Sequence, residues 1–165
     1  DGITHVDGSV LEGGGQILRN SMSLASLFKR PLRVHNVRAH RSKPGLKAQH
    51  LAGVQLVSAM HRGSLRNAAL HAEDFEYTPQ EYVPMVHTAT IGTAGSVALV
   101  VQVAMPCLVF ASEPSTTMIT GGTNVAMSPQ IDYLVNVFRP VASRMGIDFD
   151  LTVRRRGYFP KGGSL

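Results

Sequence analysis

The same order of structural signals occurs twice along this chain, and this repetition restricts its fold more than any other feature. Each half begins with a strand-like run, passes through a glycine-containing turn into an apolar helical run, and continues with a strand, a polar loop and a second helix. The expected strands are 3–6, 32–38, two short strands within 65–79, 87–91, 116–120 and 147–153. The expected helices are 16–28, 46–61, a long one within 92–111, and 130–145.

The correspondence between the halves indicates an internal duplication. Gly15 corresponds to Gly95 and Pro31 to Pro114, and no low-complexity linker separates the halves. Amphipathic helices of such units bury their apolar side against a sheet. We therefore predict an α+β fold of two duplicated βαβαββ-type units, each with two helices packed on one face of a sheet, over residues 1–82 and 83–165.

Charge and cysteine content narrow the class of partner. The 165 residues carry a formal net charge of +5, and the pI is near 9.8. This balance favours nucleic acid, a nucleotide or an acidic surface, although ordinary solubility explains a modest excess as well. The single cysteine, Cys107, lies in an apolar run and is expected to be a buried hydrophobe and not a nucleophile. One cysteine forms no intrachain disulfide, which fits an intracellular, reducing compartment.

The longest apolar run, 96–112, reads as a core helix. Gln102 and Pro106 interrupt it, which disfavours a membrane span. Gln102 is expected to be buried and to need a hydrogen-bond partner, either the backbone or a ligand. No membrane partner is expected.

The stretch LEGGGQILR (11–19) is a candidate phosphate site. If a helix begins at Gln16, its free amide groups and dipole favour an anion, and the glycines let a phosphate approach. Glu12 offers an oxygen ligand to a divalent cation, and Arg19 lies one helical turn after Gln16. A tight strand-to-helix turn with a surface glutamate and arginine accounts for the same pattern.

The stretch VRAHRSKPGLKAQH (37–50) is the second candidate. Guanidinium groups bind phosphate bidentately, and so many cations in one short span repel one another unless they share an anion. A solvated charged face is the alternative. The residues concerned are Arg38, His40, Arg41, Lys43, Lys47 and His50.

Two further loops carry weaker signals. The loop 120–132 is polar and glycine-rich, and either binds a ligand or merely connects. The stretch RRRGYFPKGG (154–163) mixes cations and aromatics, which suits nucleic acid but also an ordinary basic strand edge. The seven histidines show no zinc-ligand spacing, and no serine nucleophile elbow occurs.

Over nearly its whole length, the chain resembles the RNA 3'-terminal phosphate cyclase family. The resemblance lies in five stretches taken together: EGGGQILR, VRAHRSKPGLKAQHL, TAGSV…QVAMP, GGTNVAMSPQIDY and RRGYFPKGG. The resemblance implies a ligase that uses ATP and Mg²⁺ or Mn²⁺ to convert an RNA 3'-phosphate end into a 2',3'-cyclic phosphate, releasing AMP and pyrophosphate. It also implies repeated units similar to those of translation initiation factor three and enolpyruvyl transferases, in agreement with the duplication.

The resemblance assigns roles residue by residue. Glu12 matches the glutamate that contacts the metal, and Pro129 matches the proline lying against the adenine. Gln16 and Gln102 match nucleotide-site glutamines. The residues expected to hold the RNA phosphate are Arg19, Arg38 and Arg41, with Gln49 nearby, and the three arginines are the expected catalytic groups.

The sequence departs from the family in one respect. Family members are about twice as long, and the histidine that accepts AMP as the nucleophile lies in their C-terminal part. Its motif does not occur here, and the ending KGGSL departs from the family's third glycine. We therefore expect an N-terminal part that is inactive alone and lacks the rest of the large domain and the inserted small domain.

Two other interpretations stay open. A paralogous branch binds RNA in ribosome biogenesis without catalysis, but it lacks the intact EGGGQ loop and the paired arginines that this sequence retains. The other open interpretation is a scaffold that binds no ligand. A cyclase is expected in the nucleus of a eukaryote or the cytoplasm of a bacterium.

Overall fold

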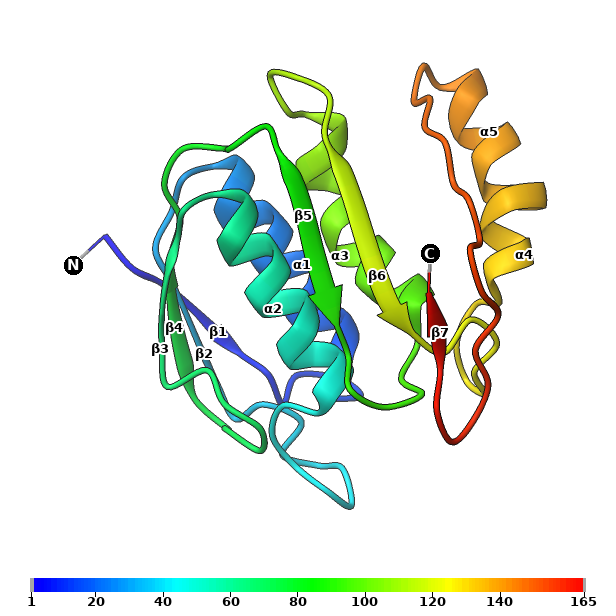
Figure 1. The fold of residues 1–165 in the computed structure, drawn as a ribbon. Coiled ribbons are helices and arrows are strands. Elements are labelled where there is room, and N and C mark those ends of the chain that lie inside the picture. The colour runs from blue at the N-terminus through cyan, green and yellow to red at the C-terminus, as the bar shows by residue number, and fades with distance from the viewer. Residues whose placement is uncertain (1, 165) are drawn as a thin grey trace.

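Two β-sheets separated by helices make up the structure, a computed structural model that describes residues 2–164 (Figure 1). The elements of the first half are β1 (Thr4–Asp7), α1 (Gly15–Leu27), β2 (Leu32–His35), α2 (Ala48–Met60), β3 (Ser64–Arg66) and β4 (Phe75–Thr78). Their strands form one sheet in the order β1-β2-β4-β3. β1 and β2 are parallel and need the crossover that α1 supplies, whereas β4 runs antiparallel to β2 and β3.

The second half forms a smaller sheet. Its elements are β5 (Val86–Thr90), α3 (Val97–Val109), β6 (Thr116–Gly121), α4 (Ile131–Tyr133), the π-helical η1 (Leu134–Phe138), α5 (Arg139–Arg144) and β7 (Gly163–Ser164). β5 and β6 are parallel, and β7 pairs antiparallel with the end of β6. The α+β class is confirmed, and so is the helix expected over 130–145, which is continuous through α4, η1 and α5. The duplication and the boundary after residue 82 stay predictions.

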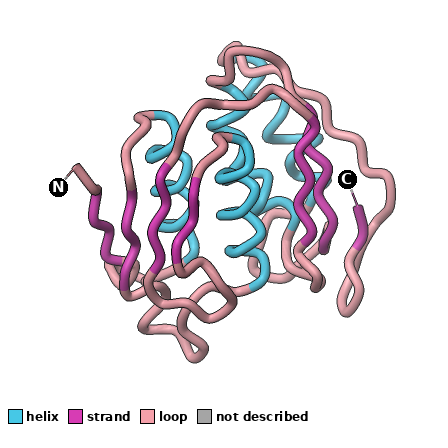
Figure 2. The backbone as a smooth tube through the Cα atoms, turned by 60° about the vertical axis from the view of Figure 1, so that its left-hand side comes forward, coloured by secondary structure: helices cyan, strands magenta, loops and turns pink. Residues whose placement is uncertain are grey.

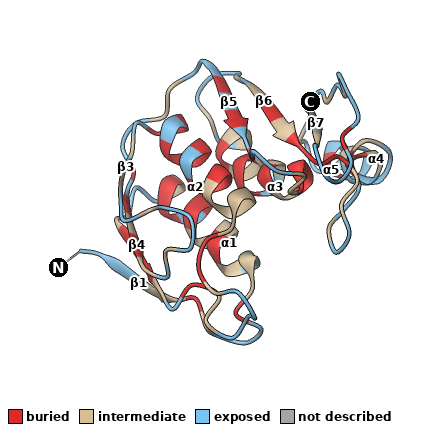
Figure 3. Cartoon of the chain, turned by 60° about the horizontal axis from the view of Figure 1, so that its bottom comes forward, coloured by how far each residue is buried: buried red, intermediate tan, exposed pale blue. Residues whose placement is uncertain are grey.

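The three long helices pack against one another between the two sheets (Figure 2). Buried residues gather where α2 and α3 lie next to each other in the tilted view of Figure 3. Gly53 of α2 allows this approach, because a Cβ there would lie 2.9 Å from Val103 Cγ1. The Ser23 hydroxyl also joins α1 to α3 by donating to the Val103 carbonyl at 2.8 Å. Cys107 lies in this core, as predicted.

The predicted strand 32–38 ends earlier, at His35. Asn36 and Arg38 adopt φ of 53° and 56°, a left-handed conformation that breaks a ladder. The turn is fixed at Val37, whose N–H donates to the Glu73 carbonyl at 2.9 Å and whose carbonyl accepts from the Gly45 N–H at 2.8 Å. The chain therefore turns from β2 into the cationic loop.

The prediction of a strand over 147–153 is wrong. Alternate side chains of this extended segment are half-buried, so its apolar pattern does select an inner side. A strand also needs a backbone partner at about 4.8 Å. A cleft of about 490 Å³, lined in part by Thr116–Ile119 of β6 and by residues 149–152, separates the two backbones instead. Alternation predicted the orientation of the side chains but not the pairing.

Among residues 2–164, no helix combines the length and apolarity that a membrane crossing requires. α3 has 13 residues, in agreement with a core helix.

Candidate phosphate-binding site

The starts of α1, α2 and α3 lie toward the lower end of the molecule in Figure 1, and α4 begins higher, at the lower end of its own helix. The parallel strands β1, β2, β5 and β6 run toward this end, so each strand-to-helix junction opens there. Loops at such junctions carry binding residues on a rigid scaffold. The sequence stretches singled out above supply these junctions.

The glycine loop leaves the start of α1 open. Gly13 adopts φ of 54°, and Gly14 precedes the helix without a side-chain cap. The amide groups of the first turn are therefore not occupied by a capping side chain, and they favour an anion. Glu12 extends into solvent beside them, with its side chain 90% exposed.

Arg41 folds from the second loop onto the glycine loop. Its Nη2 lies 3.6 Å from Glu12 Oε2. A Cβ on Gly14 would be 3.2 Å from the same Nη2, so the guanidinium lies directly over the glycines. The structure thus brings together Glu12 and Arg41, which 28 intervening residues separate in the printed sequence.

Arg19 lies against the next glycine, Gly15. A Cβ on Gly15 would lie 3.0 Å from Arg19 Nη1 and 2.5 Å from His50 Nε2. Arg19 Nη2 donates to Gln16 Oε1 at 2.8 Å, but its buried Nε has no acceptor among the described residues. Burial lowers the pKa of Arg19, although a guanidinium stays charged at neutral pH. A partly buried cation with an unused donor favours an anionic ligand.

His50 is a neutral neighbour of these cations. Its Nδ1 accepts from the Lys47 N–H at 3.2 Å, which assigns the proton to Nε2. Burial, followed by the charges of Arg38, Arg19 and Lys47 in that order, lowers the pKa of His50 to about 4. These couplings place His50 among three cations.

Arg38 closes the second loop. Its Nη1 donates to the carbonyls of Lys43 at 2.7 Å and Gly45 at 3.0 Å. Burial lowers the pKa of Arg38, with a smaller contribution from the nearby Arg41. The loop is therefore held in shape while other nitrogens of the same guanidinium are left for a ligand.

Gln49 joins the starts of α2 and α3. Its Oε1 accepts from the Ser96 N–H at 2.9 Å, and the Gly95 carbonyl accepts in turn from the Gly122 N–H at 2.7 Å. Only the Nε2 amide of Gln49 therefore remains as a donor to a phosphate. Three junctions are connected through these bonds.

The structure does not bring Gln102 or Pro129 into this group. Gln102 is exposed, so the prediction that it is buried is wrong. The apolar residues of α3 face α1 and α2, and Gln102 lies on the opposite, outer side. Pro129 lies at the fourth junction, where it forms an open hollow with Gln130 and Tyr133.

The donor set permits a hard metal ion with few protein ligands. Among residues 2–164, no three His, Cys, Asp or Glu side chains gather as a metal cage. Mg²⁺ commonly uses one or two carboxylates together with phosphate oxygens and water. Glu12, exposed at the start of α1, fits such a site as a single ligand.

Sequence reasoning found the cationic residues but missed two contacts. The packing of His50 on Gly15 and the bond from Ser96 to Gln49 join residues far apart in the sequence. The histidine three residues after Lys47 carries a detectable signal, since a side chain at that helix position reaches back to the N-cap amide.

Fold and site together define an α+β protein in which Arg19, Arg38 and Arg41 lie close to a glycine loop at the start of α1. The sequence profile of the family "RNA 3'-terminal phosphate cyclase" matches residues 10–164, and the chain belongs to this family. It is 42% identical to the RNA 3'-terminal phosphate cyclase of Desulfurococcus amylolyticus, with 99% of this chain and 46% of that protein aligned. Identity to the RNA 3'-terminal phosphate cyclase of Drosophila melanogaster is 40%, over 95% of this chain and 44% of that protein. The chain thus spans less than half the length of these relatives.

Proposed function

We propose that this chain supplies the phosphate-binding part of an ATP-dependent RNA 3'-terminal phosphate cyclase. The observation that carries the proposal is that Arg41 and Arg19 lie against the adjacent glycines Gly14 and Gly15, with Arg38 near Arg41. A terminal phosphate monoester carries two charges at neutral pH and several acceptor oxygens, which is what such a cluster neutralises. A relative's activity belongs to a protein about twice as long, so the reaction is a proposal here.

The reaction would proceed in three steps. A histidine of the C-terminal part attacks the α-phosphorus of ATP, which forms a phosphoramidate and releases pyrophosphate. The AMP then passes to an oxygen of the RNA 3'-phosphate and frees the histidine. Finally, the adjacent 2'-hydroxyl attacks the 3'-phosphorus, its proton is lost, and AMP leaves as the cyclic phosphate closes.

The residues of this chain act by positioning and by neutralising charge. Arg41 and Arg19 hold the 3'-phosphate over the open amides of α1, and Arg38 fixes the loop that carries Arg41. Gln49 adds one amide donor. Glu12 would hold Mg²⁺ or Mn²⁺, which supplies further charge neutralisation at phosphoryl oxygens when bound.

The nucleotide would occupy the neighbouring junctions. Gln16 lies at the start of α1 and holds Arg19, so it lies beside the phosphates. The hollow of Pro129, Gln130 and Tyr133 offers an exposed ring and a proline surface to a flat base such as adenine. Gln102, exposed on the outer side of α3, is the one nucleotide residue implied by the resemblance that lies away from these junctions. Because RNA and ATP are intracellular, we place the protein inside the cell, in the nucleus of a eukaryote or the cytoplasm of a bacterium.

The test uses the protein encoded by the complete reading frame, an RNA with a labelled 5' end and a 3'-phosphate, ATP and Mg²⁺ or Mn²⁺. Conversion of the end into a form that phosphatase cannot remove supports the proposal. Arg41→Ala should lower the rate about 100-fold or more, as for other preorganised charge contacts. Arg66→Ala is the matched control, because Arg66 lies in β3 and pairs with Glu76.

Two results would count against this function. Full activity of both Arg41→Ala and Arg38→Ala would remove the site assignment. Binding of RNA irrespective of its 3'-phosphate, with no product and no ATP binding, would favour the non-catalytic RNA-binding role instead.

A further inference from the structure

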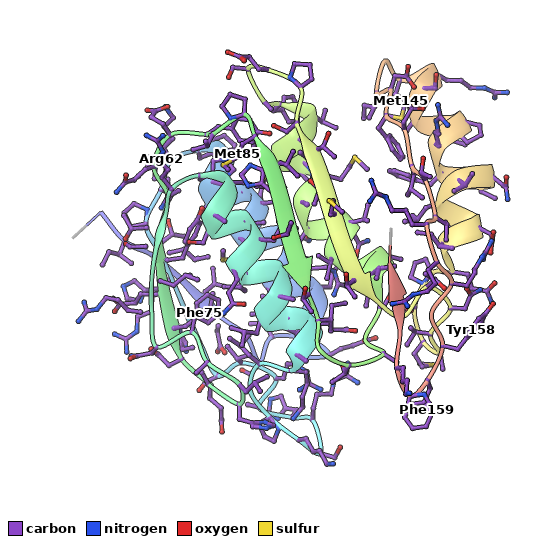
Figure 4. All side chains as sticks on the ribbon, in the orientation of Figure 1. Arg62, Phe75, Met85, Met145, Tyr158 and Phe159 are labelled. Atoms are coloured by element: carbon purple, nitrogen blue, oxygen red, sulfur yellow. The ribbon has the colours of Figure 1, made fainter. Side chains whose placement is uncertain are left out.

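The turn over residues 157–162 presents two aromatic side chains to solvent. Tyr158 is 57% exposed and Phe159 89% exposed. The N–H groups of Lys161 and Gly162 both donate to the Tyr158 carbonyl, at 3.0 and 2.9 Å, so the turn is tight. Figure 4 shows Phe159 at the lower tip of the turn and Tyr158 above it, on the outer side of the same segment. Exposed aromatics gathered in one place are typical of an interaction surface.

The sequence around this turn is rich in cations. Lys161 lies within the turn and Arg155 precedes it by two residues; both are exposed, and neither forms an ion pair within residues 2–164. Arg154 lines the cleft beside β6 instead. Arg156 alone is neutralised, through a two-pronged pair with Asp132. Aromatic rings that stack on bases, next to cations that follow a phosphate backbone, are the general means of binding unpaired nucleic acid.

The turn is also held in a fixed place relative to the phosphate-binding site. Gly157 exchanges two hydrogen bonds with Thr123: its N–H donates to Thr123 Oγ1 at 3.0 Å, and its carbonyl accepts from the Thr123 N–H at 2.8 Å. Thr123 follows Gly122, whose N–H donates to the Gly95 carbonyl. Ser96 follows Gly95, and its N–H donates to Gln49 Oε1. An uninterrupted series of bonds therefore connects the turn to the start of α2.

We propose that Tyr158 and Phe159 form a stacking platform for unpaired bases of the substrate RNA, on the 5' side of the terminal phosphate. This inference rests on the proposed function, because it extends the same site along the RNA. Lys161 of the same turn and Arg155 just before it would contact the backbone phosphates of these nucleotides. Stacking tolerates any base, so the platform favours longer unpaired RNA ends without selecting a sequence.

The experiment compares two RNAs on the protein encoded by the complete reading frame. One is a fluorescent RNA of roughly a dozen unpaired nucleotides with a 3'-phosphate, and the other is a dinucleotide with a 3'-phosphate. The Tyr158→Ala/Phe159→Ala double variant should bind the longer RNA at least about tenfold more weakly, because base stacking is lost. Its affinity for the dinucleotide and for ATP should not change. Tyr158→Trp/Phe159→Trp should restore binding of the longer RNA.

A matched control is Phe28→Ala/Phe110→Ala. These aromatics are 71% and 74% exposed, but they follow the C-terminal ends of α1 and α3, at the end of the molecule opposite the site (Figure 1). Their removal should leave the affinity for both RNAs unchanged.

The outcomes separate the platform from the proposed function. Unchanged binding of the longer RNA by Tyr158→Ala/Phe159→Ala would overturn the platform, whether another part of the protein or another partner covers the rings. Equal loss for the dinucleotide or for ATP would also overturn it and place the rings at the terminal nucleotide or the adenine. A different result would contradict the proposed function: the parent protein would bind RNA with and without a 3'-phosphate equally well.

Discussion

Gly15→Ala is expected to disturb the phosphate site by pushing His50 and Arg19 away from the start of α1. The new Cβ would lie 2.5 Å from His50 Nε2 and 3.0 Å from Arg19 Nη1, whereas ordinary contacts begin at 3.4 Å. The imidazole must therefore retreat by roughly 1 Å, and overpacking of this kind costs about 1–3 kcal/mol. Alanine in a helix regains about 0.5–1 kcal/mol over glycine. The free energy of unfolding should thus fall by at most about 2.5 kcal/mol.

The contact itself is isolated by a double-mutant cycle with His50→Ala. Removal of the imidazole leaves room for the methyl group that Gly15→Ala introduces, so the two changes should not add. Urea unfolding of the parent, both single variants and the double variant should give a coupling of about 1 kcal/mol or more in favour of the double variant. The control cycle pairs Gly14→Ala with His50→Ala and should be additive, because the Gly14 Cβ meets only the movable end of Arg41.

An additive Gly15–His50 cycle would refute the packing on which the site depends. A second measurement follows the displaced Arg19. Loss of one charge-assisted hydrogen bond is worth about 1.5–3 kcal/mol, so Gly15→Ala should weaken the binding of a 3'-phosphorylated RNA by roughly tenfold or more.

Three further predictions address single residues. The pKa of His50 is lowered from 6.5 to about 4 in the folded protein, so the unfolded state takes up a proton first as the pH falls. The stability that depends on neutral His50 is therefore lost between about pH 6.5 and pH 4. In His50→Asn, the free energy of unfolding should decline less steeply over this pH range. Gln49→Ala should lower the unfolding free energy by about 1 kcal/mol through the lost bond from Ser96, while Gln55→Ala on the exposed side of α2 should change it little. Burial raises the pKa of Cys107 to about 12, so thiol reagents at pH 8 should label it only at the rate of unfolding, and rapid labelling of the native protein would contradict this.

The elements that local sequence patterns control could be predicted. The helices α1, α2 and α3 occur where the apolar residues indicate. In α2 these residues are buried on most of the helix surface, and only Gln55 and Ala59 are exposed. The strand 32–38 was predicted too long because Asn36 and Arg38 adopt a left-handed conformation that distant hydrogen bonds at Val37 select. The local β-propensity of a segment does not depend on such distant hydrogen-bond partners and so cannot predict them.

Pairing and burial were harder to predict than periodicity. Residues 147–153 alternate as a strand does, yet their neighbour β6 lies across a cleft. Gln102 interrupts an apolar run, which suggested burial, but it lies on the outer side of α3. Both errors concern which part of the protein, or solvent, faces a residue. This depends on tertiary packing, which local sequence patterns do not determine.

The candidate site was predictable in its residue types and not in its geometry. Glycines before a helix and arginines in a loop indicate a phosphate site at each junction separately. That Arg41 reaches Glu12 depends on parallel pairing of β1 and β2, which places the two loops side by side.

The most direct test of the convergence of these junctions is the affinity difference between a 3'-phosphorylated and a 3'-hydroxyl RNA of the same sequence. It is measured for the parent, Arg19→Ala, Arg41→Ala and the double variant of the protein encoded by the complete reading frame. If both guanidinium groups hold one phosphate, each single variant loses most of the preference, and the double variant loses little more. Independent, additive losses, or a parent without any preference for the phosphate, would contradict a shared site.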